Sequence, residues 1–344
     1  MPFSQFRLFV AVVFAAFCLL CVGKVEAHEG WGIVVDRLGQ VYFSDIPTNT
    51  IWKITVEGKL EAVATNQHSH SLIRGDDGNI YGAHENGSVW RITPDGGFLE
   101  VLPPNDDFPL SLHPFIIDRD GNIYSMNSGS VQSGQVKILK RTPDAQVTTL
   151  AGDFRGYADG RGSEAKFTSI DGMDWADDGS IYVSDGVYVR RVAMDGLVTT
   201  VGGGELTSES WGEDLMGLTV APRNEILAAD YSNRRILKIM PDGNTQTVLE
   251  TGLIWSPTGV ALVGEDLYVL EHLRMPLVIL GNVEVGAYIR VRKISSDGTA
   301  TTLVTVWGRN TPVFVVVLFA AIAILVLAQR FWKRRKNRRV RAAI

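Results

Sequence analysis

The amino-acid sequence predicts an all-β fold, a six-bladed β-propeller with four-stranded antiparallel blades, together with an N-terminal signal segment and one C-terminal transmembrane helix. Two observations predict the propeller: a short β motif recurs six times, and no helical periodicity separates the copies. An apolar stretch at each end of the chain predicts the flanking segments. In chain order we expect a signal peptide at 1–27, the propeller at 28–306, a juxtamembrane linker at 307–311, the transmembrane helix at 312–332 and a basic tail at 333–344.

The first 27 residues have the pattern of a secretory signal peptide. Arg7 precedes an apolar run over residues 8–23, and small residues lie one and three positions before a cleavage site after Ala27. An uncleaved membrane anchor is the alternative interpretation. Both cysteines of the chain, Cys18 and Cys21, lie in this segment, so a cleaved chain would contain neither a thiol nor a disulfide.

The six copies of the β motif centre on Gly-x-Ile/Val-Tyr, which we assign to the second strand of each blade. The copies lie at residues 39–42, 78–81, 121–124 and 179–182, with weaker versions at 224–227 and 265–268. After each copy comes a basic residue in an apolar segment and then a turn, usually Asp-Gly, in which glycine supplies a positive φ. These basic residues are Lys53, Arg91, Lys140, Arg191, Lys238 and Lys293. Four short strands per repeat, repeated radially, are typical of a propeller blade.

The apolar run over residues 313–328 is unbroken and is followed by Phe331, Trp332 and a basic cluster. With its flanks it reaches the roughly 20 residues that cross a bilayer. Interfacial aromatic residues and a basic tail indicate a cytoplasmic C-terminus. The sequence therefore predicts a single-pass membrane protein whose propeller is extracytoplasmic, in the periplasm or outside the cell.

The charge distribution excludes nucleic acid as a partner. The whole chain has a formal net charge of −5, but residues 329–344 hold only basic charges. Without the two terminal segments, the remaining body carries a net charge of about −14. Such a surface repels phosphates and attracts cations.

The repeated pattern, apolar-apolar-Asp-x-x-Gly-x-Ile/Val-Tyr followed by Ile-x-Lys-Ile-x-x-Asp-Gly, resembles NHL repeats. It is also similar to the gluconolactonase/strictosidine-synthase-like superfamily of six-bladed propellers. Residues 150–167 are similar to the linker between NHL blades, which accounts for the 58 residues between the third and fourth copies. The resemblance implies the fold, but this architecture carries lactonases, lyases and scaffolds alike.

All six histidines fall on two kinds of loop, those leading into the first strand of a blade and those after the second strand. In a propeller these loops share one face. The histidines are His28, His68, His70 and His113 before first strands, and His84 and His272 after second strands. The other second-strand ends carry Asp45, Asn127, Asp185, Asp230 and Glu271. The resemblance to NHL repeats implies that Asp45, Asp185 and Asp230 chiefly tie loops together by hydrogen bonds.

Histidines together with carboxylates on one face predict a divalent-metal site. We expect His70, His84 and His113 as ligands, His68 and His272 as alternates, and Glu85 or Glu29 as a ligand or general base. The identity of the ion, zinc or calcium, stays open. The resemblance to gluconolactonase-like enzymes implies calcium held by oxygen ligands, with Glu29, Asn127 and Asp185 as loose counterparts, whereas similarity to peptide-amidating lyases implies zinc held by histidines.

The predicted function is a metal-dependent hydrolase, lactonase-like, or a lyase that acts on a small and amphipathic molecule. The alternative from a different class is a non-enzymatic scaffold that binds a protein or cell-envelope partner. The sequence contains no phosphate-binding loop, no His-Glu-x-x-His motif and no nucleophile elbow.

Overall fold

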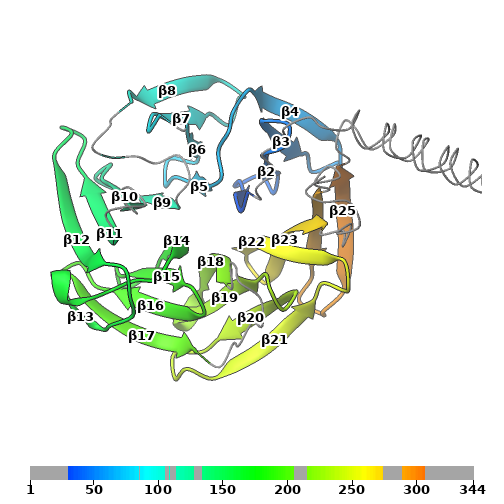
Figure 1. Cartoon of the computed structure of the whole chain (residues 1–344). Helices are drawn as coiled ribbons and strands as arrows, with labels where there is room; N and C mark the ends of the chain where they lie inside the picture. The colour runs from blue at the N-terminus through cyan, green and yellow to red at the C-terminus, as the bar shows by residue number, and fades with distance from the viewer. Residues whose placement is uncertain are drawn as a thin grey trace, which may run out of the picture. The chain divides into compact units, whose positions relative to one another are not determined.

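Six antiparallel sheets stand around a common axis, and the chain visits them in order (Figure 1). The computed structural model describes residues 30–84, 86–104, 108, 114–127, 134–204, 215–273 and 289–306, which belong to one compact unit. The predicted signal peptide, linker, transmembrane helix and basic tail lie outside these ranges. Within the described ranges, no helix has the length and apolar character needed to cross a bilayer.

Each of the first three blades consists of four consecutive strands. Blade 1 contains β1 (Ile33–Val35), β2 (Val41–Asp45), β3 (Thr50–Ile54) and β4 (Leu60–Thr65). Blade 2 contains β5 (Leu72–Arg74), β6 (Ile80–Ala83), β7 (Val89–Ile92) and β8 (Phe98–Leu102). Blade 3 contains β9 (Phe115–Ile117), β10 (Ile123–Asn127), β11 (Gln135–Arg141) and β12 (Val147–Phe154).

The last three blades repeat this order, with one addition in blade 4. Blade 4 contains β13 (Gly160–Arg161), the short 3₁₀ helix η1 (Gly162–Glu164), β14 (Ile170–Trp175), β15 (Ile181–Asp185), β16 (Tyr188–Val192) and β17 (Leu197–Gly203). Blade 5 contains β18 (Leu215–Ala221), the 3₁₀ helix η2 (Pro222–Asn224), β19 (Glu225–Asp230), β20 (Arg235–Ile239) and β21 (Thr245–Glu250). Blade 6 contains β22 (Trp255–Val263), β23 (Asp266–Leu273), β24 (Ile289–Ile294) and β25 (Ala300–Val306).

The prediction of six four-stranded blades is confirmed, and the long third interval contains a fifth strand that the sequence did not predict. In that interval β13 pairs antiparallel with β17, at the outer edge of blade 4. The added strand covers an edge that would otherwise expose unpaired backbone groups.

The first strand of every blade lies next to the axis and contacts the first strand of the next blade, so that β22 and β1 close the ring. Glycine allows this close approach. A Cβ on Gly172 would lie 2.6 Å from the Met216 carbonyl oxygen, and a Cβ on Gly217 would lie 2.9 Å from that of Thr258. A Cβ on Gly259 would collide with the carbonyl oxygen of Trp31, across the closure between blades 6 and 1.

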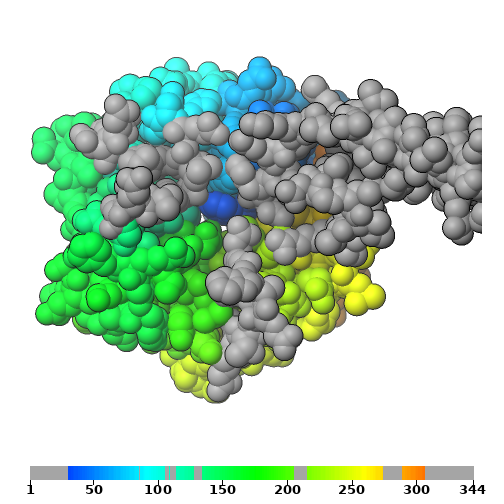
Figure 2. All heavy atoms as spheres, viewed as in Figure 1, coloured from blue at the N-terminus to red at the C-terminus, as the bar shows by residue number. Residues whose placement is uncertain are grey.

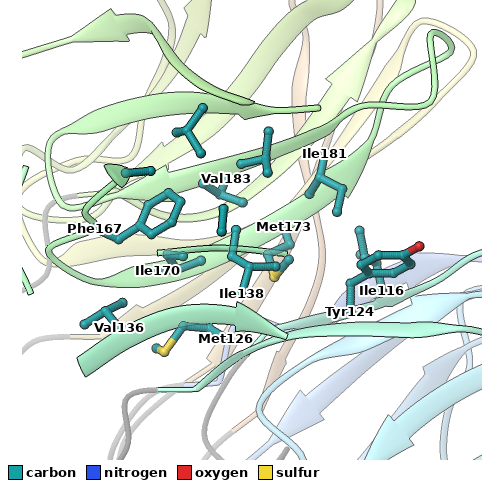
Figure 3. Close-up of a cluster of buried hydrophobic side chains, with 14 residues drawn as sticks. Ile116, Tyr124, Met126, Val136, Ile138, Phe167, Ile170, Met173, Ile181 and Val183 are labelled. Atoms are coloured by element: carbon teal, nitrogen blue, oxygen red, sulfur yellow. The ribbon is translucent and has the colours of Figure 1, made fainter. Parts of the chain in front are cut away.

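The hydrophobic core is divided into six clusters of buried residues, one between each pair of adjacent blades. Figure 3 shows the cluster between blades 3 and 4, where Ile138 lies near Phe167, Ile170 and Val183. Each sheet therefore buries its two faces against its neighbours, which explains why the second strands are buried along almost their whole length.

The repeated tyrosine and basic residue form a cross-strand pair in each blade that has both. Tyr124 pairs with Lys140 and Tyr268 with Lys293, and each ammonium lies 5.6–5.8 Å from the centre of its ring. The aspartate of the preceding turn accepts a hydrogen bond from the tyrosine hydroxyl, as Asp118 does from Tyr124. Burial of the tyrosine, and to a smaller extent the negative charge of Asp118, raises the pKa of Tyr124 to about 12. The most repetitive part of the sequence is thus structural.

Candidate functional site

The loops predicted to share a face do so. His68, in the connection from β4 to β5, contacts Asn49 of the β2–β3 turn, with 2.8 Å between His68 Nδ1 and Asn49 Oδ1. A backbone contact joins the same two loops: the Gln67 N–H donates to the Asn49 carbonyl oxygen at 2.8 Å, and at blades 5 and 6 the Thr251 N–H donates to the Arg234 carbonyl oxygen at 2.9 Å. We call the face that holds these two kinds of loop the top face.

Two of the predicted metal ligands lie in direct contact on this face. The Nε2 atoms of His68 and His70 are 3.0 Å apart, and their ring centroids are 5.0 Å apart. His70 is 3% exposed, whereas His68 is half-buried. With metal–nitrogen bonds of about 2.0–2.1 Å, two ligands of one tetrahedral ion have nitrogens about 3.3 Å apart. In this structure the two rings share a hydrogen bond at this distance, which is also close to the separation that a shared ion requires.

The backbone around His70 fixes its position at the axis. The carbonyl oxygen of His70 accepts hydrogen bonds from the N–H groups of Trp31 at 2.9 Å and Gly32 at 2.8 Å, which joins blade 2 to blade 1. The Trp31 ring lies 5.2 Å from the His70 ring. Ser69 Oγ accepts a hydrogen bond from the Ala83 N–H at 3.0 Å and so fixes the segment to β6. The imidazole is consequently held in place by contacts with two blades.

A carboxylate occupies the equivalent position of blade 4. In the aligned repeat, Asp171 precedes the axial Gly172 just as His70 precedes Ser71. The axis of the ring can be located in Figure 2, where the beginning of the described chain (blue) lies at its centre. Asp171 is half-buried and accepts a hydrogen bond from Ser169 Oγ at 2.9 Å. Burial raises the pKa of Asp171 to about 6. The sequence alone does not single out Asp171 as a site residue, because the shift of its pKa arises only from burial in the folded protein.

The other predicted site residues that the structure describes, His84 and His272, do not form a metal-binding group with the histidine pair. His84 follows β6, lies with its ring 6.5 Å from that of Trp90, and has a pKa lowered by burial. His272 lies on β23 and is 1% exposed. Among the described residues, no three His, Cys, Asp or Glu side chains are placed to hold one ion. Glu29, Glu85 and His113 lie outside the described ranges, so the complete ligand set stays a prediction.

The family follows from the sequence of the propeller itself. A model of the family described as "SMP-30/Gluconolactonase/LRE-like region" matches residues 30–271, from the start of blade 1 into β23. The chain belongs to this family. Among curated proteins, none matches this SMP-30/gluconolactonase/LRE-like chain in sequence.

Solved structures resemble this SMP-30/gluconolactonase/LRE-like propeller in fold. A gluconolactonase from Xanthomonas campestris is 13% identical, with 71% of this chain and 83% of that chain covered and a TM-score of 0.54. Regucalcin from Agrobacterium tumefaciens, described as a calcium-binding protein, is 16% identical over 72% and 83%, with a TM-score of 0.52. A streptogramin B lyase is 15% identical over 81% and 84%, with a TM-score of 0.50. At these identities the likeness establishes the six-bladed fold.

The carboxylates at the ends of the second strands are engaged in hydrogen bonds and ion pairs, as expected for Asp45, Asp185 and Asp230. Asp45 accepts from Trp52 Nε1 at 3.0 Å, Asp185 from Arg190 Nη1 at 2.7 Å, Asp230 from Arg235 Nε at 2.7 Å, and Glu271 from Arg290 and Arg292. Calcium needs six to eight oxygen ligands, largely carboxylates and carbonyls. Asp185, the loose counterpart of a calcium ligand, does not fit that role because Arg190 already neutralises it. The paired imidazoles fit a transition metal such as zinc instead.

Proposed function

We propose that this protein is a membrane-anchored, extracytoplasmic propeller that binds a divalent metal on its top face and acts as a hydrolase of the lactonase type, or as a lyase, on a small amphipathic molecule. The observation that carries the proposal is the His68–His70 pair, whose Nε2 atoms lie 3.0 Å apart. Membership of the SMP-30/gluconolactonase/LRE-like family supports it. The gluconolactonase and the streptogramin B lyase among the similar structures show that such propellers support both reaction classes.

His68 and His70 would hold the metal, with a third ligand from His113, Glu29 or Glu85, since His84 and His272 do not complete a group of three with them among the described residues. Nitrogen donors favour zinc over calcium. When bound, such an ion lowers the pKa of a coordinated water and polarises a carbonyl oxygen.

The chain's own residues supply orientation and proton transfer. Trp31 packs beside the His70 ring and offers a flat apolar surface next to the pair. Asp171, with its pKa raised to about 6, is largely ionised at neutral pH and can accept a proton from a group at the axis. Its hydrogen bond from Ser169 holds the carboxylate in one orientation. Asp171 thus joins Glu29 and Glu85 as a candidate general base.

Metal analysis of the purified full chain in nanodiscs tests this proposal. After dialysis against trace zinc, we expect about one tightly held ion per chain in the wild type and a loss of most of it in His70→Ala and His68→Ala. Gln67→Ala, which changes the residue next to the pair, is the matched control and should keep the ion.

The same preparations should be assayed with a panel of lactones of increasing chain length. Turnover that requires both the ion and His70 supports the enzyme. An ion-free wild type that turns over none of these compounds would overturn it in favour of a binding scaffold for a protein or cell-envelope partner.

A further inference from the structure

Two large apolar side chains lie exposed side by side on the top face between blades 5 and 6. Leu253 is 89% exposed and Ile254 is 48% exposed, in the connection from β21 to β22. Single exposed apolar residues are common on soluble proteins and need no explanation. Leu253, however, is more exposed than every other exposed large apolar residue of the described chain, and Ile254 lies next to it. An exposed apolar pair of this kind lowers solubility and requires an explanation.

The loop that carries the pair is fixed at both ends. The Thr251 N–H donates to the Arg234 carbonyl oxygen at 2.9 Å, and the Thr251 hydroxyl lies 2.6 Å from the Trp255 carbonyl oxygen, across the loop. Gly252 has φ +93°, a conformation that favours glycine and turns the chain before Leu253. The hydrophobic pair is therefore held outward by its backbone.

The surroundings of the pair are those of a residue at a membrane interface. The guanidinium of Arg290 lies 4.3 Å from the centre of the Trp255 ring and 3.3 Å, through Nη2, from the Thr251 carbonyl oxygen. Tryptophan and arginine beside exposed leucine or isoleucine are typical of segments that lie in the headgroup region of a bilayer. The charges nearby are engaged in ion pairs, since Arg290 and Arg292 share Glu271 and Arg235 pairs with Asp230. Apolar contact, more than charge, would bind this surface to lipid.

The chain also leaves the propeller at this edge. Along the top of blade 6 the register places Ser256 opposite His272, His272 opposite Ile289, and Ile289 opposite Val306. Because neighbouring strands of a sheet lie about 4.8 Å apart, β22 and β25, the first and last strands of this blade, lie about 14 Å apart. Only residues 307–311 separate Val306 from the apolar segment that begins at Pro312, a reach of about 17 Å when fully extended.

We infer that Leu253 and Ile254 form a wedge that inserts into the headgroup region of the bilayer in which the chain is anchored. This inference rests on the membrane anchor of the proposed function. The wedge, together with the short tether, would hold the top face against the membrane and open the axial site towards amphipathic molecules dissolved in lipid.

Site-specific fluorescence on the full chain in phosphatidylcholine vesicles tests the wedge. In a background in which Cys18 and Cys21 are serine, Leu253→Cys is labelled with an environment-sensitive dye, and lipids with spin labels near the headgroup serve as quenchers. Leu38→Cys and Val56→Cys are the controls, because both residues are also exposed but lie in turns of blade 1 on the face opposite the top face. We expect blue-shifted emission and several-fold stronger lipid quenching at position 253 than at the two controls.

Each outcome decides between the anchor and the wedge. Vesicle flotation in alkaline carbonate reports the anchor alone, so a chain that fails to float contradicts the anchor. A floating chain whose dye at position 253 emits as in water, or is shielded but not quenched by lipid, overturns the wedge and leaves the anchor intact. Unchanged thermal melting of the labelled protein confirms that the fold is retained.

Discussion

Arg190 and Asp185 form an ion pair in which both side chains are 0% exposed and Arg190 Nη1 lies 2.7 Å from Asp185 Oδ2. The guanidinium also donates to the Ala158 carbonyl oxygen at 2.8 Å and to Asp159 Oδ1 at 2.8 Å, and it lies 4.8 Å from the centre of the Tyr157 ring. One buried cation thus joins β16 to the segment that precedes β13, which accounts for the ordered path of the insertion in blade 4.

Replacing Arg190 with methionine should lower the free energy of unfolding by about 3–5 kcal/mol, because Asp185 would remain as a buried charge without its cation. Arg191→Met is the matched control. Arg191 pairs with Asp178 on the surface, where such a pair contributes about 0–1 kcal/mol. Chemical denaturation of both variants measures the difference. Equal losses would show that the buried pair is no more important than the exposed one.

Gly259→Ala should weaken the closure of the ring. The new methyl group would collide with the Trp31 carbonyl oxygen, and backbone atoms of β1 cannot move aside without disturbing blade 1. We expect a loss of at least about 3 kcal/mol, at the upper end for an overpacked site. Gly264→Asn, at φ +60° with nothing near its Cβ, should cost little, since asparagine tolerates this conformation. Equal melting temperatures for the two variants would show that this close contact between blades 6 and 1 does not limit the size of residue 259.

The pKa of Asp171 predicts a loss of stability as pH rises. Because the folded pKa of about 6 lies above the ordinary value of 3.8, the folded protein holds this proton more tightly than the unfolded chain. Below pH about 4 both states are protonated and the shift has no effect. Between pH about 4 and 6 the stability falls, by up to about 3 kcal/mol, and above pH 6 the loss is complete.

Asp171→Asn should therefore melt at a higher temperature than the wild type at pH 7–8 and at the same temperature at pH 4, measured with a chelator present. Asp178→Asn provides a control of opposite sign. The hydrogen bond from Ser180 lowers the pKa of Asp178 to about 2, so the folded state favours its charge and the variant should lose stability at pH 7. A pH profile of Asp171→Asn parallel to that of the wild type would show that this carboxylate is not desolvated.

Glu271→Gln should destabilise blade 6, since Glu271 is 0% exposed and is the acceptor for both Arg290 and Arg292. Removing its charge leaves two largely buried guanidiniums with a neutral acceptor, at a cost of about 3–5 kcal/mol. Asp266→Asn, which removes the partner of Lys293 at the surface of the same sheet, should cost less than about 1 kcal/mol. Denaturation midpoints that shift equally in the two variants would refute the distinction.

The fold was predictable because its determinants are local. Turn residues such as Asp-Gly and the alternation of apolar side chains recur with each blade, and they specify strands and hairpins without reference to distant parts of the chain. The pairing of Tyr124 with Lys140 follows from the same repeat, since a hairpin of fixed register places the two opposite one another. The expectation that Asp45, Asp185 and Asp230 tie loops together rested instead on the resemblance to NHL-like blades.

The site was less predictable because it depends on which loops of different blades meet. The repeat placed His68, His70 and His84 on one face, and His68 and His70 are neighbours in one loop, but only the tertiary structure places Asn49 and Trp31 of blade 1 against them. The raised pKa of Asp171 likewise arises from burial in the folded protein, which no local pattern encodes. Register and turn chemistry act over a few residues, whereas distances across the axis and the loss of water around a side chain are set by the closed ring.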